Sequence, residues 1–117
     1  MKQYTTPEQT AKLIELGFEK PSNTIIKEEP IYREGSIIDW KPIAEEGSYS
    51  IGELMAVLPE NVAKQDEMPS TLNISLMNGE WCVQYADFLG ADFEFCNTEL
   101  VDALFDMVVK LKERGVI

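Results

Sequence analysis

The chain has 117 residues, a length typical of one domain, and 44% of them are hydrophobic, which excludes wholesale disorder. Its 21 acidic and 10 basic residues, with no histidine, give a formal net charge of −11. Charge of this sign and size repels phosphate backbones and anionic lipid surfaces. We therefore expect one domain over residues 1–117 that binds neither nucleic acid directly nor membranes.

The sequence shows no sign of export or membrane insertion. No apolar run approaches the roughly 20 residues that span a bilayer, and residues 1–7 lack the apolar core of a signal peptide. We therefore expect a cytoplasmic protein. In that reducing compartment Cys82 and Cys96 are expected to be free thiols, and their pairing is the alternative.

The first elements along the chain are a helix and an irregular hairpin. Thr6 and Pro7 are typical of the cap and first residue of a helix. The β-branched and aromatic residues that follow predict a hairpin of residues 25–33 against residues 36–41. Pro30 cannot donate a ladder hydrogen bond, so its strand is expected at a sheet edge or with a bulge.

A second short helix follows. Ser50 and Glu53 have the spacing of a capping box, in which each side chain accepts a hydrogen bond from the other residue's amide. Pro59 ends this helix, because the residue before a proline disfavours helical backbone. The polar residues 60–71 are expected to form a loop.

Residues 72–86 predict a β-hairpin. Asn78-Gly79 is the preferred two-residue sequence of a type I′ turn, in which both residues have positive φ. This turn sets the register and places six apolar side chains on one face of the hairpin. The expected opposite pairs are Leu72–Tyr85, Ile74–Val83 and Leu76–Trp81.

The chain ends with a strand and a helix. Phe93 and Phe95 alternate with acids and predict the third strand of an antiparallel meander. The last helix is expected from about Asn97 to Arg114, with acids in its first turns and bases in its last. This order predicts an α+β fold: a mainly antiparallel sheet (a hairpin plus a three-strand meander) with about three helices packed on one face.

No catalytic, cofactor-binding or metal-ligating residues are predicted. Without histidine the chain lacks the commonest general base and metal ligand, and two cysteines are too few for the usual zinc site. Asp87, Asp92 and Glu94 bracket a tight turn, which we interpret as solvated rather than as a Ca²⁺ or Mg²⁺ site. The chain is therefore expected to hold no cofactor and not to be an enzyme. A carboxylate-dependent hydrolase is a third alternative, because paired carboxylates can perform acid–base chemistry in a cleft.

The acids are concentrated in a stretch without bases. Between Lys64 and Lys110 the chain has no Lys, Arg or His but nine acids. Glu80 and Glu99 have structural interpretations as a turn flank and a helix-dipole partner, and Asp106 is expected to pair with Lys110. Four acids remain as a candidate partner-binding surface: Asp87, Asp92, Glu94 and Asp102.

Three segments resemble small uncharacterised proteins of prophages and mobile elements in Bacteroides-type gut bacteria. The resemblance implies a cytoplasmic accessory protein and carries over no catalytic residue. The segments are residues 49–59 (YSIGEL through LP), residues 72–85, and residues 99–117 (ELVDA through GVI).

The expected function is non-enzymatic. We expect a protein–protein interaction or accessory module that contacts a basic protein surface, with Trp40 as an exposed aromatic contact. The alternative is an acidic inhibitor that mimics nucleic acid and occupies a DNA-binding protein. The simplest interpretation of the acidic residues is that they only keep the protein soluble. The sequence does not indicate an oligomeric state.

Overall fold

The computed structural model describes residues 1–64, 67–87 and 89–117. Within these residues the chain forms three helices and six strands. The strands pair antiparallel in a two-stranded and a four-stranded sheet. The α+β class predicted from the sequence is therefore confirmed.

Contacts divide the chain into two compact units. We call Thr6–Ser48 the hairpin unit, and Met1–Thr5 together with Tyr49–Ile117 the sheet unit. The sequence analysis treats residues 1–117 as one domain, and the contacts give that domain two parts.

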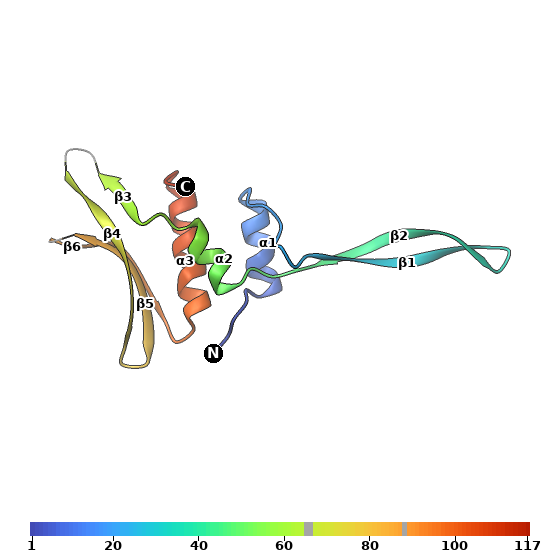
Figure 1. Cartoon of the computed structure of the whole chain (residues 1–117), viewed down its shortest axis with the longest axis horizontal. Coiled ribbons are helices and arrows are strands. Elements are labelled where there is room, and N and C mark those ends of the chain that lie inside the picture. The colour runs from blue at the N-terminus through green and yellow to red at the C-terminus, as the bar shows by residue number, and fades with distance from the viewer. Residues whose placement is uncertain (65–66, 88) are drawn as a thin grey trace. The chain divides into compact units, whose positions relative to one another are not determined.

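The hairpin unit contains one helix, α1 (Pro7–Glu15), and two strands, β1 (Ile25–Arg33) and β2 (Ser36–Glu46). Thr6 caps α1 as predicted, and its hydroxyl accepts a hydrogen bond from the amide of Gln9 in a capping box. β1 pairs with β2 alone, as the long ribbon in Figure 1 shows. Both strands are therefore edge strands.

The β1–β2 hairpin is irregular in the way that its proline requires. The predicted edge position of the Pro30 strand is confirmed, because β1 pairs on one side only. The register shifts at two places, one on each side of Pro30, and the extra residues, Ile38 and Ile43, lie on β2. Glu34 and Gly35 form the turn with φ values of 53° and 79°. The predicted bounds of the first strand are confirmed, whereas β2 is longer than the predicted strand of residues 36–41.

The sheet unit contains two helices and four strands in the sheet order β3-β4-β5-β6. Strands β4 to β6 form the predicted three-strand meander, and β3 is an additional strand at its edge. The bounds are α2 (Ile51–Val57), β3 (Asn61–Lys64), β4 (Glu67–Met77), β5 (Glu80–Asp87), β6 (Gly90–Asn97) and α3 (Leu100–Glu113).

The polar residues 60–71 do not form the predicted loop. β3 pairs antiparallel with the start of β4, and Asn61 lies opposite Thr71. Backbone hydrogen bonds hold such a pair whatever its side chains, so a polar edge strand leaves no apolar alternation in the sequence. Within this prediction, residues 65–66 lie outside the described residues.

The predicted type I′ turn between β4 and β5 is confirmed, because Asn78 and Gly79 have φ values of 54° and 79°. The register also agrees with the prediction in all three pairs: Leu72 opposite Tyr85, Ile74 opposite Val83, and Leu76 opposite Trp81. In the two pairs farther from the turn, Tyr85 and Val83 are buried in the core. Leu76, next to the turn, is exposed.

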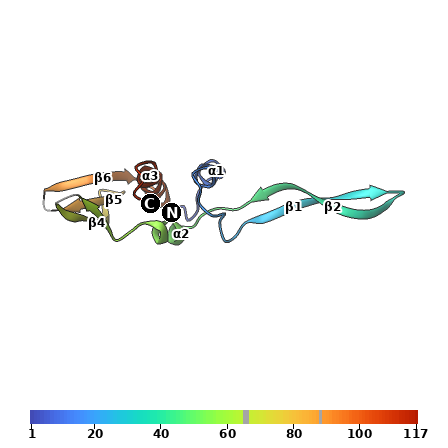
Figure 2. The same ribbon diagram turned by 90° about the horizontal axis from the view of Figure 1, so that it is seen from above.

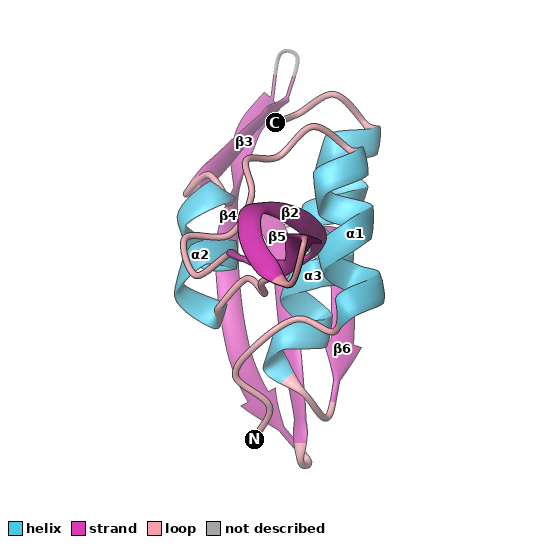
Figure 3. Cartoon of the chain, turned by 90° about the vertical axis from the view of Figure 1, so that its right-hand side faces the viewer, coloured by secondary structure: helices cyan, strands magenta, loops and turns pink. Residues whose placement is uncertain are grey.

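The core of the sheet unit lies between α3 and one face of the sheet. Helix α3 contacts β5, β6 and α2, and Figures 1 and 3 show α2 and α3 on the same side of β4–β6. Figure 2 shows the same packing from above. Burying one Leu or Val side chain is worth about 1.5–3 kcal/mol, so this layer is the main source of stability. The buried side chains of α3 are Leu100, Val101, Ala103, Leu104, Met107, Val108 and Leu111.

The first residues of the chain are part of this unit. The amide of Thr5 donates to the carbonyl of Tyr49 at 2.9 Å, and the amide of Tyr49 donates to Thr5 Oγ1 at 2.9 Å. The amide of Ile51 donates to the carbonyl of Gln3 at 3.2 Å. These bonds hold the N-terminal segment beside the start of α2.

We expect Tyr85→Phe to lower the free energy of unfolding by about 1–2 kcal/mol. The Tyr85 hydroxyl donates to the carbonyl of Pro59 at 2.7 Å, and its removal leaves that carbonyl without this partner. Burial raises the pKa of Tyr85 to about 12, so the hydroxyl remains a donor at neutral pH.

The measurement is urea unfolding followed by circular dichroism. Tyr32→Phe is the matched control, because Tyr32 is exposed, and it should leave the unfolding midpoint unchanged. Equal midpoints for Tyr85→Phe and the wild type would show that this hydrogen bond does not stabilise the fold.

Candidate functional site

The four acids singled out from the sequence do not form one site. Asp87 and Asp92 lie at the connection between β5 and β6. Asp87 Oδ1 accepts a hydrogen bond from the amide of Leu89 at 2.8 Å, and the Asp92 carboxylate accepts one from the hydroxyl of Ser70, which is fully buried. Both carboxylates therefore take part in local structure.

The other two acids lie elsewhere in the sheet unit. Glu94 lies on β6 between Phe93 and Phe95, which face the core, so its side chain is on the opposite face of the sheet. Asp102 lies in the first turn of α3 and forms an ion pair of 2.8 Å with Lys2 Nζ. A continuous acidic docking surface made of these four residues is not present in the structure.

The predicted ion pair between Asp106 and Lys110 is wrong. Among the described residues, neither of these side chains is in an ion pair. Burial first and the Asp102 carboxylate second raise the pKa of Asp106 above its ordinary value. In this part of α3, Asp106 is therefore repelled by Asp102, four residues before it, and is not attracted to Lys110.

Many of the exposed large apolar side chains among the described residues lie on the β1–β2 hairpin. Directly opposite residues share a face, and Pro30 lies opposite Trp40 while Tyr32 lies opposite Ile37. We call this surface the Trp40 face. Its apolar members are Ile26, Pro30, Tyr32, Ile37, Trp40 and Pro42.

The side chains of the Trp40 face are open to solvent. Trp40 is 53% exposed and Tyr32 is 63% exposed, and every residue of β2 is exposed. Trp40, proposed from the sequence as an exposed contact, thus lies in the middle of an apolar row. The sequence analysis did not identify the other members of that row.

The opposite face of the hairpin is mixed, because it carries two ion pairs together with the exposed side chains of Ile25 and Ile31. Glu29 lies opposite Lys41, and these two side chains form an ion pair of 2.8 Å. Lys27 and Glu46 form a second ion pair of 2.8 Å on the same face. The two faces therefore differ in composition: the Trp40 face carries the aromatic residues and prolines, and the other face carries the ion pairs between the two strands.

The base of the hairpin is held within its own unit. The amide of Ser48 donates to Asn23 Oδ1 at 3.0 Å, and the backbone of Gly47 passes close to Thr24. A Cβ atom at Gly47 would lie 2.6 Å from Thr24 Oγ1 and 2.9 Å from its Cα, so a side chain does not fit there. Lys20 adds an ion pair of 2.6 Å with Glu45.

Cys82 and Cys96 were expected to be free thiols, and the structure instead joins them in a disulfide. They lie directly opposite each other on β5 and β6 with Cα atoms 4.1 Å apart, the close approach typical of a pair without mutual hydrogen bonds. The prediction considered the compartment alone, whereas the register of the meander brings the two sulfurs together.

One groove within the described residues lies between β6 and α3. Its volume of about 260 Å³ is smaller than that of typical ligand pockets, about 300–1,000 Å³. It is lined by Phe95, Asp106, Val109, Lys110 and Glu113. No described observation therefore favours the hydrolase alternative.

We expect Asp106→Asn to raise the free energy of unfolding at pH 7 by less than ~1 kcal/mol, because the carboxyl is partly solvated. The folded state raises the pKa of this acid, so stability is lost as pH rises through and above the unfolded pKa of 3.8. The substitution removes that loss at pH 7, and it should have no effect well below pH 3.8, where the carboxyl is protonated in both states.

Urea unfolding at pH 7 and at acid pH measures the difference. Glu80→Gln, at an exposed position of β5, is the control for the change in net charge. A variant less stable than the wild type at pH 7 would contradict the assigned direction of the pKa shift.

In the part of the chain that the structure describes, no helix has the length and apolar character needed to cross a bilayer. Comparison with known proteins finds no matching family model, no matching curated protein and no matching solved structure.

Proposed function

We propose that this chain is a non-enzymatic protein–protein interaction module that binds a basic protein surface through the Trp40 face. The observation that carries the proposal is the exposed row of apolar side chains around Trp40 and Tyr32, on a hairpin whose other face carries two ion pairs. We further propose that it acts in the cytoplasm as an accessory protein, in line with the sequence resemblance.

The apolar row needs a reason to be exposed. A two-stranded hairpin is marginally stable alone in water, and contiguous exposed apolar patches commonly mark interaction sites. Trp and Tyr are enriched in the centres of protein interfaces because they bury large areas at low entropic cost. Trp40 and Tyr32 would supply such contacts, with Ile37 beside them.

A protein surface fits this face better than a small ligand. The side chains extend along two strands instead of around a cavity, and the exposed backbone of β1 and β2 is equally extended. A partner that lies along the hairpin would cover the whole row at once.

The charges of the hairpin favour a basic partner. Lys27 and Lys41 are already engaged in ion pairs, whereas Glu28 and Glu34 have no ion-pair partner within the described residues. Glu28 lies opposite Pro42, on the Trp40 face itself. A lysine or arginine beside an apolar patch of the partner would therefore meet an unpaired carboxylate.

No specific observation favours the nucleic-acid mimic. Mimicry of a phosphate backbone needs a regular row of exposed carboxylates, whereas Asp92 and Asp102 are engaged with Ser70 and Lys2. The acids of the sheet unit are instead consistent with a role in solubility.

We expect Trp40→Ala combined with Tyr32→Ala to abolish partner binding without unfolding the sheet unit, because both side chains are exposed. The measurement uses immobilised full-length chain to capture proteins from the native host at low and at high salt. Captured proteins should be basic, and their yield should fall at high salt, because screening weakens the contact with Glu28.

Ile31→Ala is the matched control, because Ile31 is an exposed apolar residue opposite Asp39, on the other face of the same hairpin. It should leave capture unchanged. Capture that survives the double substitution, or that depends equally on Ile31, would overturn the proposal. Sedimentation of the purified chain adds a second check: reversible dimerisation lost in the double variant would identify a second copy, rather than a basic partner, as the occupant.

A further inference from the structure

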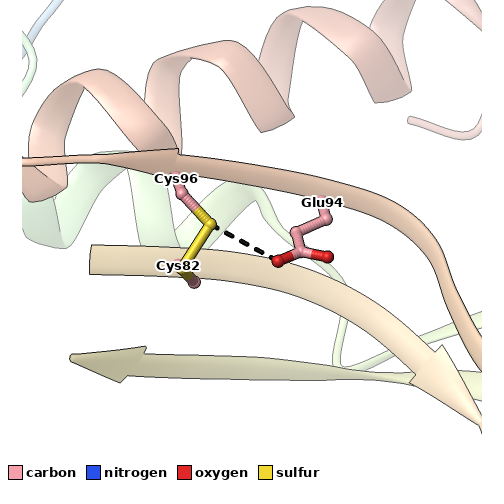
Figure 4. Close-up of a disulfide and its surroundings, with 3 residues drawn as sticks. All are labelled: Cys82, Glu94 and Cys96. Atoms are coloured by element: carbon pink, nitrogen blue, oxygen red, sulfur yellow. Dashed lines mark hydrogen bonds between the residues drawn. A yellow bond between two sulfur atoms is a disulfide. The ribbon is translucent and has the colours of Figure 1, made fainter. Parts of the chain in front are cut away.

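Three potential metal ligands meet on the face of the sheet that points away from α3. Cys82 on β5 lies directly opposite Cys96 on β6, and Glu94 is two residues before Cys96 on the same face. The two sulfurs and a Glu94 oxygen all lie within 4.8 Å of one another. Figure 4 shows the Glu94 carboxylate turned toward the sulfur of Cys96.

No basic residue shares the two cross-strand rows around this cluster. One row is Ser75, Cys82 and Cys96, and the other is Asn73, Gln84 and Glu94. Glu94 forms no ion pair within the described residues, and the hydrogen-bond partner of its carboxylate there is Cys96. The residues between Lys64 and Lys110, which include all three potential ligands, contain no base in sequence.

We propose that Cys82, Cys96 and Glu94 form a redox-controlled binding site for a thiolate-preferring divalent cation such as Zn²⁺. With the thiols reduced, two sulfurs and one carboxylate oxygen supply three ligands of a kind that zinc accepts. The fourth position remains open to water. With the disulfide formed, the same sulfurs are no longer available as thiolates, and the site is closed.

The spacing of the ligand atoms suits this assignment. With Zn–S and Zn–O bonds of about 2.3 and 2.1 Å, a sulfur and an oxygen at two corners of a zinc tetrahedron lie about 3.6 Å apart. Cys96 Sγ lies 3.4 Å from Glu94 Oε1. Two zinc-bound sulfurs lie about 3.8 Å apart. Once reduction breaks the S–S bond, rotation of the Cys82 side chain supplies that separation.

The chemistry balances in two steps. A dithiol reductant transfers two electrons and two protons to the Cys82–Cys96 disulfide, which gives two thiols and the oxidised form of the reductant. Zn²⁺ then replaces the thiol protons and binds the Glu94 carboxylate, so binding releases two protons. A sulfur in a disulfide carries no proton, whereas the Cys96 thiol can donate a hydrogen bond to Glu94 and hold it in place before the metal arrives.

The test uses the full chain in two forms, air-oxidised and reduced with a phosphine that binds zinc poorly. Zinc affinity is measured by competition with a chromophoric chelator. Thermal unfolding, measured with and without Zn²⁺, reports binding independently. The reduced chain should bind one Zn²⁺ and unfold at a higher temperature with it, and the oxidised chain should do neither.

Single substitutions identify the ligands. Cys82→Ser should lower zinc affinity by 100-fold or more, and Glu94→Gln should lower it about 10-fold or more, by loss of one ligand. Glu80→Gln, two residues before Cys82 on β5 but outside the three-residue cluster, should not change the zinc affinity. Cobalt(II) bound to the reduced wild type should show thiolate-to-metal charge-transfer absorption that is absent from Cys82→Ser.

The outcomes that overturn the proposal are equally specific. Zinc binding of equal strength by the oxidised and reduced chains would exclude the cysteines as ligands. Glu94→Gln with wild-type affinity would exclude the carboxylate and with it the three-ligand site. If reduction alone unfolds the chain and Zn²⁺ does not restore the folded signal in the thermal experiment, the reduced fold holds no such site.

Discussion

The packing of α3 on β5 and β6 is the interaction on which the sheet unit depends. Val83 and Tyr85 from the sheet and most of the inner side of α3 are buried there. The same contact decides which residues of the meander face solvent. Because the helix covers one face of the sheet, the alternate residues Cys82, Glu94 and Cys96 lie on the other face. The closeness of Cys82, Cys96 and Glu94 is thus a consequence of strand register and not of a local sequence motif.

The hairpin unit follows a different principle. β1 and β2 have one partner each, and their prolines and bulges limit regular pairing at the edges. The ion pairs Glu29–Lys41 and Lys27–Glu46 stabilise one face only modestly, because exposed pairs contribute about 0–1 kcal/mol. Among the described residues, the Trp40 face has no equivalent ion pairs between its two strands. For this reason we propose that another protein binds this face and buries its apolar side chains.

Local rules explain what could be predicted from the sequence. Asn78-Gly79 and the Ser50–Glu53 capping box each act within a few residues, and both appear in the structure as expected. The Cys82–Cys96 pair depends on the register of β6, which includes a bulge that no turn residue announces. Which residues belong to the Trp40 face depends likewise on two bulges in β2. The turn at Glu34 and Gly35 fixes the pairing next to it, but the pairing beyond each bulge does not follow from the turn. The separate surroundings of the four acids Asp87, Asp92, Glu94 and Asp102 could not be predicted either. They depend on tertiary contacts such as the Lys2–Asp102 ion pair, which joins residues far apart in the chain.

Hydrogen–deuterium exchange of the isolated chain tests most directly whether the Trp40 face lacks cover within the molecule. We predict that amides of residues 25–46 exchange orders of magnitude faster than those of β5 and α3, at low and high protein concentration alike, because a two-stranded hairpin opens readily. If residues 25–46 are instead protected as strongly as the core at every concentration, the chain covers this face itself and no partner is needed to cover it.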